Sequence, residues 1–444
     1  MARRRRRRTL PAEPFNAEIE SLSHDGKGVA HLDGKVHFID GALPGEKVSF
    51  IYTDRRRDFA EGRLEELFSR SPIRIEPGCQ HFGICGGCSW QHISDADQII
   101  EKQKLLQEQF KHIGKIESFE LWPPLTGPVW GYRHKARLGV KNVDKKGRVL
   151  VGFREKRSAF VADIKRCPVL HPSVGEKLEL LSELIGTLSV RSKLPQIEVA
   201  VGEDKVILVF RILEDVTPDD LLKMSKFAEQ EGFVICLQRG GPDTVVTLDG
   251  QPVPELGYTL PDEDVKFSFL PTDFTQVNPE INRKMIRRVI ETLDPTPEDR
   301  ILDLFCGLGN FTLPLAKKAG EVVGVEGSEV LVKRAAENAR KNGLDNVHFY
   351  TADLFKELKG QPWAKEKFTK VLLDPSRAGA KEVIERLPAL GIKTVCYVSC
   401  NPSTLARDTN ILVHELGYKL VKAGVMDMFP HTAHVESIAL FEKR

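Results

Sequence analysis

Cys400 is the residue whose type and position most clearly allow covalent chemistry. It follows Val395 to Val398, a short apolar run typical of a β-strand, and Pro402 ends that run. Open parallel sheets bind ligands beyond the carboxyl ends of their strands, and a thiolate placed there can add to an electrophilic carbon. A buried structural cysteine would show the same local pattern. The residues that accompany Cys400 must therefore decide between the two interpretations.

A dense cluster of cysteines is the second chemical signal. Five and then two residues separate Cys79, Cys85 and Cys88, close to the four and two of plant-type iron–sulfur proteins. A fourth ligand is required, and Cys167 is the best candidate because Pro168 follows it, as in the Cys-Pro that closes ferredoxin runs. Four thiolates can also hold structural zinc. The spare ligands nearby are His81 and His92.

A glycine loop and acidic residues suggest a nucleotide-type cofactor. Gly307-Leu308-Gly309 lacks the full G-x-G-x-x-G, which does not favour a hydride-transfer cofactor. Glu326 ends the next expected strand, 23 residues after Asp303, where an acidic residue accepts hydrogen bonds from ribose hydroxyls. Asp353, at the end of the third strand, can hold an adenine amino group. In this order the residues resemble the class I methyltransferase fold, which implies S-adenosylmethionine as cofactor.

The loop after the fourth strand narrows the acceptor of the methyl group. Leu373 to Arg377 reads Leu-Asp-Pro-Ser-Arg, in place of the Asp-Pro-Pro-Tyr type of loop in methylases that act on adenine or glutamine. An exocyclic amine has a lone pair that attacks the methyl group, whereas C5 of a pyrimidine has almost none. Methylation of C5 therefore needs a nucleophile that first adds to C6, and this role suits Cys400.

Length and composition describe a multidomain globular protein. A chain of 444 residues is long enough for about three domains. No apolar run is long enough for a transmembrane helix, and no apolar segment follows Arg3 to Arg8, so we expect a cytoplasmic protein with reduced cysteines. The net charge of +2 depends on the six arginines of that run. Affinity for RNA must then come from local patches together with this tail.

The elements that position these residues fall into three folded parts. From Phe15 to Phe68, short strand-like pieces separated by glycines predict a small β-barrel, which resembles a TRAM domain, although it could equally dock a protein. Asp95 to Ile113 has the apolar spacing of a helix, and the region that starts at Gly131 reads as α+β. From Phe269, alternating strands and helices predict a doubly wound, mainly parallel sheet.

With these residues assembled, the chain resembles the uridine-C5 methyltransferases of RNA, most of all the members that modify large-subunit (23S) ribosomal RNA. The segments that carry the resemblance are Phe274 to Asn278, Asp303 to Gly307, Leu373 to Gly379, Ser399 to Pro402 and His434 to Ser437. The barrel and the cysteine cluster together are typical of the 23S enzymes. The resemblance also favours a [4Fe-4S] cluster over zinc, in the α+β middle domain.

The resemblance implies a division of the chain and a role for each site residue. Cys400 is the expected nucleophile and Glu436 the expected base that removes the C5 proton from a flipped-out uridine. An exposed, inert carboxylate at Glu436 is the alternative. Neither His431 nor His434 falls on the catalytic position, and we interpret both as structural. The expected S-adenosylmethionine site is lined by Gln276, Phe305, Asn310, Glu326, Asp353 and Asp374. The expected parts are a basic tail (1–12), the TRAM-like barrel (13–70), the iron–sulfur and middle domain (71–92 and 125–268) and the methyltransferase domain (93–124 and 269–444).

Three other functions remain to be weighed. Within the class, the substrate could be transfer RNA rather than ribosomal RNA. From another class, a radical S-adenosylmethionine methylthiotransferase also combines a TRAM-like barrel with cysteines, but its cysteines have three and two residues between them rather than five and two. An RNA-binding scaffold without activity would not need both Cys400 and Glu436. We therefore expect a monomeric methyltransferase that acts on ribosomal RNA and has no membrane partner.

Overall fold

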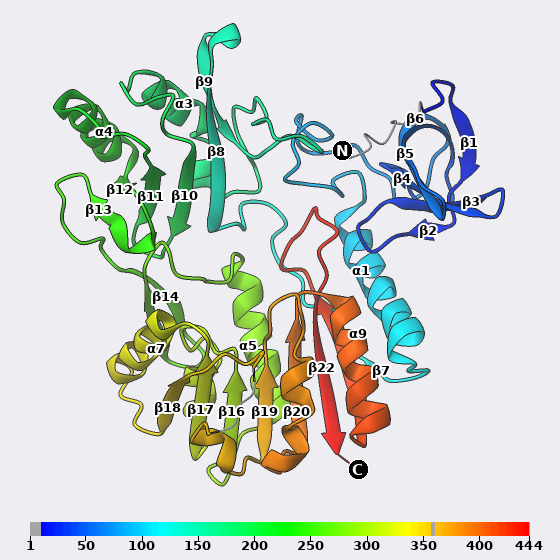
Figure 1. The fold of residues 1–444 in the computed structure, drawn as a ribbon, viewed down its shortest axis with the longest axis vertical. Helices are drawn as coiled ribbons and strands as arrows, with labels where there is room; N and C mark the ends of the chain where they lie inside the picture. Colours follow the sequence, from blue (N-terminus) through cyan, green and yellow to red (C-terminus); the bar gives the residue numbers. More distant parts are fainter. Residues whose placement is uncertain (1–9, 357–359, 444) are drawn as a thin grey trace, which may run out of the picture. The chain divides into compact units, whose positions relative to one another are not determined.

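The computed structural model describes residues 10–356 and 360–443, so the expected contact of the arginine run with RNA lies outside the described residues. The chain forms two compact units. The first runs to Gly83 and adds Cys88–Leu105 and Pro430–His434; the second contains Ile84–Gly87, Leu106–Phe429 and the segment from Val435 on. Figure 1 shows the elements of both units in the order of the chain.

The first unit contains a six-stranded sheet, which agrees with the barrel strands expected from the glycine spacing. The strands are β1 (Phe15–Glu18), β2 (Ser21–Leu22), β3 (Gly28–Leu32), β4 (Lys35–Asp40), β5 (Lys47–Arg55) and β6 (Phe59–Ser69). Their order is β1-β5-β6-β4-β3-β2. Ile19, Ile39, Val48 and Phe50 fill its core. The Arg55 guanidinium lies 4.8 Å from the Tyr52 ring, so a cation and an aromatic ring share one edge of this sheet.

The expected helix after the cysteine cluster is confirmed. Helix α1 spans Asp95–Gln109 and continues into a π-helical turn, Phe110–Gly114. The buried residues of this segment include Ile99, Leu106 and Phe110, which recur at helical spacing.

The second unit begins with an α+β part. Its sheet has the order β13-β12-β11-β10-β8-β9. The strands are β8 (Lys135–Val143), β9 (Arg148–Gly152), β10 (Gln196–Val201), β11 (Val206–Arg211), β12 (Phe233–Gln238) and β13 (Val245–Thr247). The helices are α2 (Pro172–Gly175), α3 (Leu178–Gly186) and α4 (Pro218–Glu231). Thr217 and Asp220 form a capping box at the start of α4, which satisfies free N–H groups of its first turn.

The larger sheet of the second unit confirms the doubly wound, mainly parallel arrangement. Its order is β18-β17-β16-β19-β20-β22-β21-β7. The strands are β16 (Arg300–Leu304), β17 (Glu321–Glu326), β18 (Val347–Thr351), β19 (Lys370–Leu373), β20 (Thr394–Ser399), β21 (Tyr418–Met426), β22 (Glu436–Lys443) and the short β7 (Glu120–Leu121). Strands β18, β17, β16, β19 and β20 are parallel to one another, and β22 is antiparallel to both β20 and β21.

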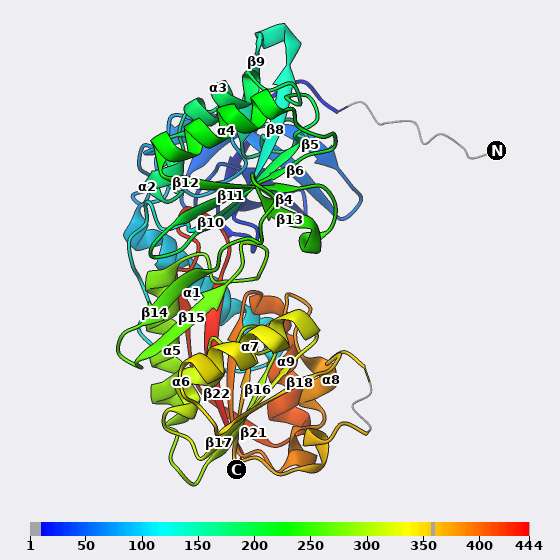
Figure 2. The same cartoon turned by 90° about the vertical axis from the view of Figure 1, so that its left-hand side faces the viewer.

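Helices cover both faces of this sheet. They are α5 (Pro279–Leu293), α6 (Thr312–Ala316), α7 (Glu329–Lys341), α8 (Lys381–Ile384) and α9 (Pro402–Asn410). Figure 2 shows α5 and α6 on one side of the sheet and α8 and α9 on the other. The apolar core between helices and sheet includes Ile286, Val289, Ile301, Leu372 and Val398, all of them almost fully buried.

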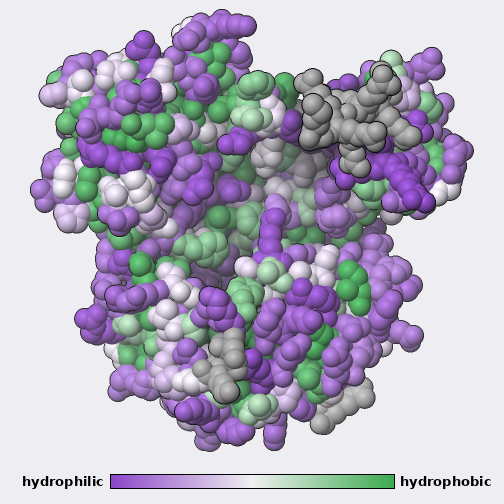
Figure 3. All heavy atoms as spheres, viewed as in Figure 1, coloured by the Kyte–Doolittle hydropathy of each residue, from purple (hydrophilic) through white to green (hydrophobic). Residues whose placement is uncertain are grey.

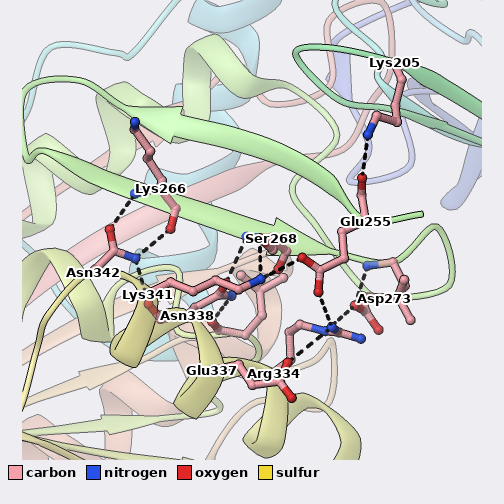
Figure 4. Close-up of polar contacts among 12 residues, drawn as sticks. Lys205, Glu255, Lys266, Ser268, Asp273, Arg334, Glu337, Asn338, Lys341 and Asn342 are labelled. Atoms are coloured by element: carbon pink, nitrogen blue, oxygen red, sulfur yellow. Dashed lines mark hydrogen bonds and ion pairs between the residues drawn. The ribbon is translucent and has the colours of Figure 1, made fainter. Parts of the chain in front are cut away.

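A β-hairpin, β14 (Leu256–Leu260) and β15 (Val265–Phe269), is fastened to α7 of the larger sheet. Figure 4 shows these polar contacts. Glu255 pairs with Arg334 at 3.2 Å and with Lys341 at 2.7 Å. The Asn338 side chain accepts a hydrogen bond from the Ser268 backbone N–H at 2.9 Å. These contacts hold the hairpin, and the side chains on it, at a fixed place relative to α7.

The expected iron–sulfur cluster is the part of the fold prediction that is wrong. Within residues 10–356 and 360–443, no group of three or more His, Cys, Asp or Glu side chains is arranged to hold a metal ion. Cys79 and Cys88 belong to the first compact unit, whereas Cys85 and Cys167 belong to the second. A metal site of this type needs four thiolate sulfurs at about 2.3 Å from one point. The spacing of the cysteines along the chain permits their four sulfurs to converge on one point, but it does not ensure that they do.

No helix in the described part of the chain is both long and apolar enough to cross a membrane. Figure 3 shows hydrophilic and hydrophobic residues interspersed over the face that it draws. Single exposed apolar side chains such as Phe160 and Phe274 are common on protein surfaces.

Candidate active site

The carboxyl ends of four neighbouring parallel strands bring the expected site residues to one edge of the larger sheet. In the register of the sheet, Leu304 at the end of β16 pairs with Val325 of β17 and with Leu373 of β19, and Leu373 pairs with Tyr397 of β20. The loops that follow these strands therefore start side by side. Open α/β sheets bind their ligands at this edge.

The glycine loop after β16 has a backbone shape that few residues tolerate. Phe305, Gly307 and Gly309 all have positive φ, at 67°, 57° and 91°. A β-carbon at Gly309 would lie 2.5 Å from the Leu313 side chain, so this position also requires the absence of a side chain. The loop can thus run close to the start of α6, where backbone N–H groups point toward the loop's open side.

Glu326 is held against this loop by two backbone N–H groups. Its Oε2 accepts a hydrogen bond from Gly307 N at 3.2 Å, and its Oε1 accepts one from Ser328 N at 3.0 Å. A carboxylate oxygen has a second lone pair, so each can still accept a hydrogen bond from a ribose hydroxyl. The two backbone bonds fix the direction in which those lone pairs point.

Asp303 lies beneath the loop and is fully buried. Its Oδ2 accepts a hydrogen bond from Thr312 Oγ1 at 2.5 Å, and its Oδ1 has no hydrogen-bond partner among the described residues. Burial, together with smaller contributions from the neighbouring Asp374 and Glu326, raises the pKa of Asp303 to about 7. A buried carboxyl oxygen without a partner is costly. A ligand that carries N–H donors or a positive charge would relieve this cost.

Asn310 belongs to a hydrogen-bonded network with two residues that sequence reasoning missed. Its Oδ1 accepts bonds from Tyr258 Oη at 2.8 Å and from Asn282 Nδ2 at 3.1 Å. Its Nδ2 donates to Asn282 Oδ1 at 2.9 Å. The two amides therefore bind each other reciprocally, and one N–H of Asn310 has no acceptor among the described residues. Tyr258 comes from the β14–β15 hairpin and Asn282 from α5, and no local sequence pattern marked either.

Gln276 lines a cavity of about 250 Å³ in the second unit, next to that network. The cavity is also lined by Tyr258, Asn282, Arg283, His134 and His171. The two histidine rings lie 4.8 Å apart. Burial, together with smaller contributions from His171 and Arg283, lowers the pKa of His134 to about 4, so His134 is neutral at physiological pH. The cavity thus offers amide and hydroxyl groups together with an ion pair, in which Arg283 lies 3.1 Å from Glu203.

Asp353 and Phe305 meet on the other side of the glycine loop. The Asp353 carboxylate pairs with Lys356 at 2.9 Å and accepts a bond from the Phe355 backbone N–H at 3.1 Å. The Phe305 and Phe355 rings lie 5.7 Å apart. The Lys356 hydrogen bond is the main cause of the lowered pKa of Asp353. Phe355 is exposed and Phe305 is partly buried, and an accessible aromatic pair beside a carboxylate is suited to a flat heterocycle. The sequence did not indicate Phe355.

Cys400, Glu436 and Asp374 come together at the ends of β20, β22 and β19. Burial raises the pKa of the half-buried Cys400 to about 11, and the negative charges of Glu436 and Asp374 contribute to the rise. Arg377 acts in the opposite direction. Burial also raises the pKa of Asp374, to about 7. The Cys400 thiol is therefore protonated at neutral pH in the free protein, and it must lose its proton before it can act as a nucleophile.

The turn that carries Cys400 is fixed by short-range hydrogen bonds. Asn401 N donates to Ser399 Oγ at 3.1 Å, and Asn401 Oδ1 caps α9 by accepting from Ser403 N at 3.1 Å. Ser437 Oγ donates to the Ser399 carbonyl at 3.3 Å. Strand β20, the cap of α9 and the neighbouring strand β22 thus all hold the residues on either side of the Cys400 thiol.

The comparisons with known proteins agree with this geometry. The model of a family described as tRNA (Uracil-5-)-methyltransferase matches residues 95–444, and the model of the TRAM domain matches residues 10–64. A protein of Methylococcus capsulatus named 23S rRNA (uracil(1939)-C(5))-methyltransferase RlmD is 56% identical over 443 residues, which cover 100% of both chains. A protein of the same name from Alkalilimnicola ehrlichii is 54% identical over 439 residues, 99% of each chain.

A solved structure also resembles the chain over most of its length. It is the crystal structure of the Pyrococcus abyssi tRNA (uracil-54, C5)-methyltransferase in complex with S-adenosyl-L-homocysteine. The two chains are 26% identical, with a TM-score of 0.74, and the match covers 96% of this chain and 100% of the other. The class I methyltransferase fold and the TRAM domain expected from the sequence are thereby confirmed.

Proposed function

The chain belongs to the tRNA (uracil-5-)-methyltransferase family, and we propose that it transfers a methyl group from S-adenosylmethionine to C5 of a uridine in 23S ribosomal RNA. The relatives that match its full length at 54% and 56% identity are named for uracil 1939 of that RNA. We propose the equivalent uridine as its target. We further propose that the protein is a monomer and acts in the cytoplasm.

One observation supports the proposal most strongly: the thiol of Cys400 and the carboxylate of Glu436 lie close together at the same edge of the larger sheet as the glycine loop. Cys400 follows β20 directly, and the carboxylates of Glu436 and Asp374 are near enough to act on its pKa. A methylase for an exocyclic amine needs no such thiol. C5 of uracil does need one, because its C5–C6 double bond must first be activated by a nucleophile.

We assign the cofactor to the loops around Glu326, Asn310 and Gln276. S-adenosylmethionine supplies an electrophilic methyl group on a positively charged sulfur. Glu326 would accept hydrogen bonds from the ribose hydroxyls, and Asp353 would accept one from the adenine amino group, with the ring beside Phe305. Asn310 and Gln276 would bind polar groups of the methionine portion. The unpartnered Oδ1 of Asp303 and the acidic Asp374 fit a ligand of positive charge.

We propose the following roles for the two catalytic residues. The target uridine must leave its base stack before either face can be approached. The Cys400 thiol gives its proton to solvent, and the sulfur then forms a bond to C6, so that the electrons of the C5–C6 double bond shift and C5 becomes a nucleophile. After C5 has gained the methyl group, with S-adenosylhomocysteine as the leaving group, Glu436 accepts the proton from C5. The electrons of that C–H bond restore the double bond, and the bond between Cys400 and C6 breaks.

A mapping experiment tests the proposed function. Ribosomal and transfer RNA are isolated from cells that contain or lack the protein, and 5-methyluridine is located in both by mass spectrometry of nuclease fragments. We expect one position of 23S ribosomal RNA to lose its methyl group when the protein is absent. Complementation with the Cys400→Ala variant should not restore it. Loss of 5-methyluridine from transfer RNA alone would instead show that the substrate is transfer RNA, as the name of the Pyrococcus abyssi enzyme says of that protein.

A further inference from the structure

Asp408 is a buried carboxylate outside the set of residues that the proposed function employs. It lies on α9, eight residues after Cys400, and its side chain is 0% exposed. A carboxylate in the protein interior is costly unless hydrogen bonds and an opposite charge compensate it. The groups that provide this compensation come from β20, from α9 itself and from the loop that follows β19.

One carboxylate oxygen of Asp408 joins β20 to the loop that follows β19. Asp408 Oδ2 accepts a hydrogen bond from Tyr397 Oη at 2.7 Å and another from Ala380 N at 2.8 Å. Tyr397 lies on β20, three residues before Cys400. Ala380 ends the loop that begins at Asp374. A single oxygen atom therefore fixes the distance between these two segments.

The other oxygen engages Arg407, which reaches the same loop. Arg407 Nε and Nη2 lie 2.8 Å and 2.7 Å from Asp408 Oδ1. Arg407 Nη2 also donates to the Ala378 carbonyl at 2.9 Å, and Asn401 Nδ2 donates to the Arg377 carbonyl at 3.1 Å. The segment after Cys400 thus holds the backbone at Arg377, Ala378 and Ala380.

Gly379 shows how closely the loop approaches this ion pair. Its φ is 82°, a value that favours glycine, and a β-carbon there would lie 2.5 Å from Arg407 Nη2 and 2.6 Å from Asp408 Oδ2. The backbone therefore passes in direct contact with both charged groups. A shift of the ion pair would require a shift of the loop.

The loop carries Arg377, whose positive charge lowers the pKa of the Cys400 thiol, against three effects that raise it. Burial, Glu436 of β22 and Asp374 after β19 all raise the pKa of the Cys400 thiol, and Arg377 lowers it. The guanidinium can act on the thiol only if the loop keeps it near. The hydrogen bonds described above hold the backbone from which this guanidinium extends.

We infer that Asp408 is a positioning residue, which through Arg407 and Ala380 holds the Asp374–Ala380 loop so that Arg377 faces Cys400. The inference rests on the proposed function, in which Cys400 is the nucleophile. Asp408 would then contact neither the RNA nor the methyl donor, but it would influence the reactivity of the Cys400 thiol, which bonds to the RNA.

The test measures how alkylation of Cys400 by iodoacetamide depends on pH in the full-length protein without RNA. Trypsin cleaves after Lys393 and Arg407, so Cys400 shares a peptide with the fully buried Cys396, which serves as an internal reference for native structure. We expect Asp408→Asn to move the midpoint of Cys400 alkylation upward by about one pH unit, which slows the reaction about tenfold at neutral pH. Arg377→Gln should have the same effect.

The combined variant separates positioning from a general loss of stability. If Asp408 acts through Arg377, adding Asp408→Asn to Arg377→Gln should move the midpoint no further, because the two changes remove one interaction. The methylation rate kcat of Asp408→Asn should fall about tenfold, while KM for S-adenosylmethionine changes less than about twofold. Asp345→Asn, an exposed aspartate before β18, is the matched control and should leave both quantities unchanged.

An unchanged midpoint in folded Asp408→Asn, or additive shifts in the double variant, would overturn the inference. If Asp408→Asn does not fold, Arg407→Gln decides the question, because Arg407 is partly exposed and its loss removes the bond to Ala378 while the Asp408 side chain keeps its hydrogen bonds from Tyr397 and Ala380. A midpoint unchanged in Arg407→Gln would then overturn it. Alkylation needs no RNA, so these outcomes are independent of whether the proposed function itself holds.

Discussion

Cys400 and Glu436 lie at matching positions on two antiparallel strands. The last pair of β20 and β22 joins Ser399 with Ser437, and the next residue on each strand toward the ligand edge is Cys400 on one and Glu436 on the other. The strand register therefore sets the distance between the proposed nucleophile and the proposed base. Neighbouring positions on paired strands agree with the proposal that the two groups act on neighbouring carbons, C6 and C5, of one uracil ring.

The first prediction concerns the release of the product. Glu436→Gln preserves the shape of the side chain but cannot accept the C5 proton, so the bond between Cys400 and C6 should persist after methyl transfer. We expect a methylated RNA that remains attached to the protein, seen as a band of reduced mobility in denaturing gel electrophoresis with labelled methyl donor.

The double variant Cys400→Ala with Glu436→Gln is the control for that experiment. It should give no attached RNA, because the bond-forming sulfur is absent. Free, unmodified RNA as the sole product of Glu436→Gln would count against Glu436 as the base that acts after methylation.

The second prediction concerns the charge of the bound methyl donor. S-adenosylmethionine carries a positive sulfonium, whereas S-adenosylhomocysteine carries a neutral sulfur. A positive charge near Cys400 stabilises its thiolate and lowers its pKa from about 11. At a fixed pH below that value, alkylation of Cys400 should thus be faster with saturating S-adenosylmethionine than with saturating S-adenosylhomocysteine. Equal rates would place the sulfur too far away to act on the thiol.

The third prediction concerns Tyr258, the hairpin residue that binds Asn310. Tyr258→Phe removes only the hydroxyl that donates to Asn310 Oδ1 at 2.8 Å, so Asn310 loses part of its fixation. We expect the Kd for S-adenosylhomocysteine to rise about fivefold, equivalent to about 1 kcal/mol, as measured by calorimetry.

Tyr418→Phe is the matched control for Tyr258→Phe. Tyr418 is buried, whereas Tyr258 is partly buried, and the Tyr418 hydroxyl likewise makes one hydrogen bond, which it donates to the Ile392 carbonyl at 2.8 Å. This variant should lower thermal stability without changing the Kd. A similar rise of Kd in both variants would show that the effect is general and not due to Asn310.

The fourth prediction concerns stability at low pH. Burial alone would raise the pKa of Asp220, but hydrogen bonds from Ser189 and Thr217 lower it to about 2. A carboxyl whose pKa is lower in the folded than in the unfolded state stabilises the fold above the unfolded value, near 4, and this contribution is lost as pH falls toward 2. Asp220→Asn should therefore reduce the free energy of unfolding by about 2 kcal/mol at pH 6. The difference from wild type should shrink between pH 4 and pH 2 in urea titrations.

Local sequence patterns were sufficient for the larger sheet and for the residues at its ligand edge. The alternation of apolar runs and helical segments from Phe269 on predicted the parallel strands, and Glu326, Asp374 and Cys400 could be placed because each follows directly after such a run. Strand ends are local features, and parallel strands bring their ends to one edge without further information.

The cysteines show where this reasoning failed. Cys79, Cys85, Cys88 and Cys167 have a spacing that permits a common ligand, but the described residues contain no group arranged to hold a metal ion. Whether sulfurs converge depends on the path of the backbone over many residues. The path of the backbone cannot be inferred from the spacing of the cysteines along the chain.

The sequence by itself thus determined the type of sheet, the glycine loop beside Glu326 and the thiol at the end of β20, since these depend on short-range patterns of polarity and on turn residues. Only the tertiary structure decided which side chains hold them in place: Tyr258 and Asn282 around Asn310, and Asp408 between Tyr397 and Ala380. These partners come from segments that are far apart in the chain or on different elements. Hydrogen bonds between them form only when packing brings the atoms within about 3 Å, and no local pattern records that distance.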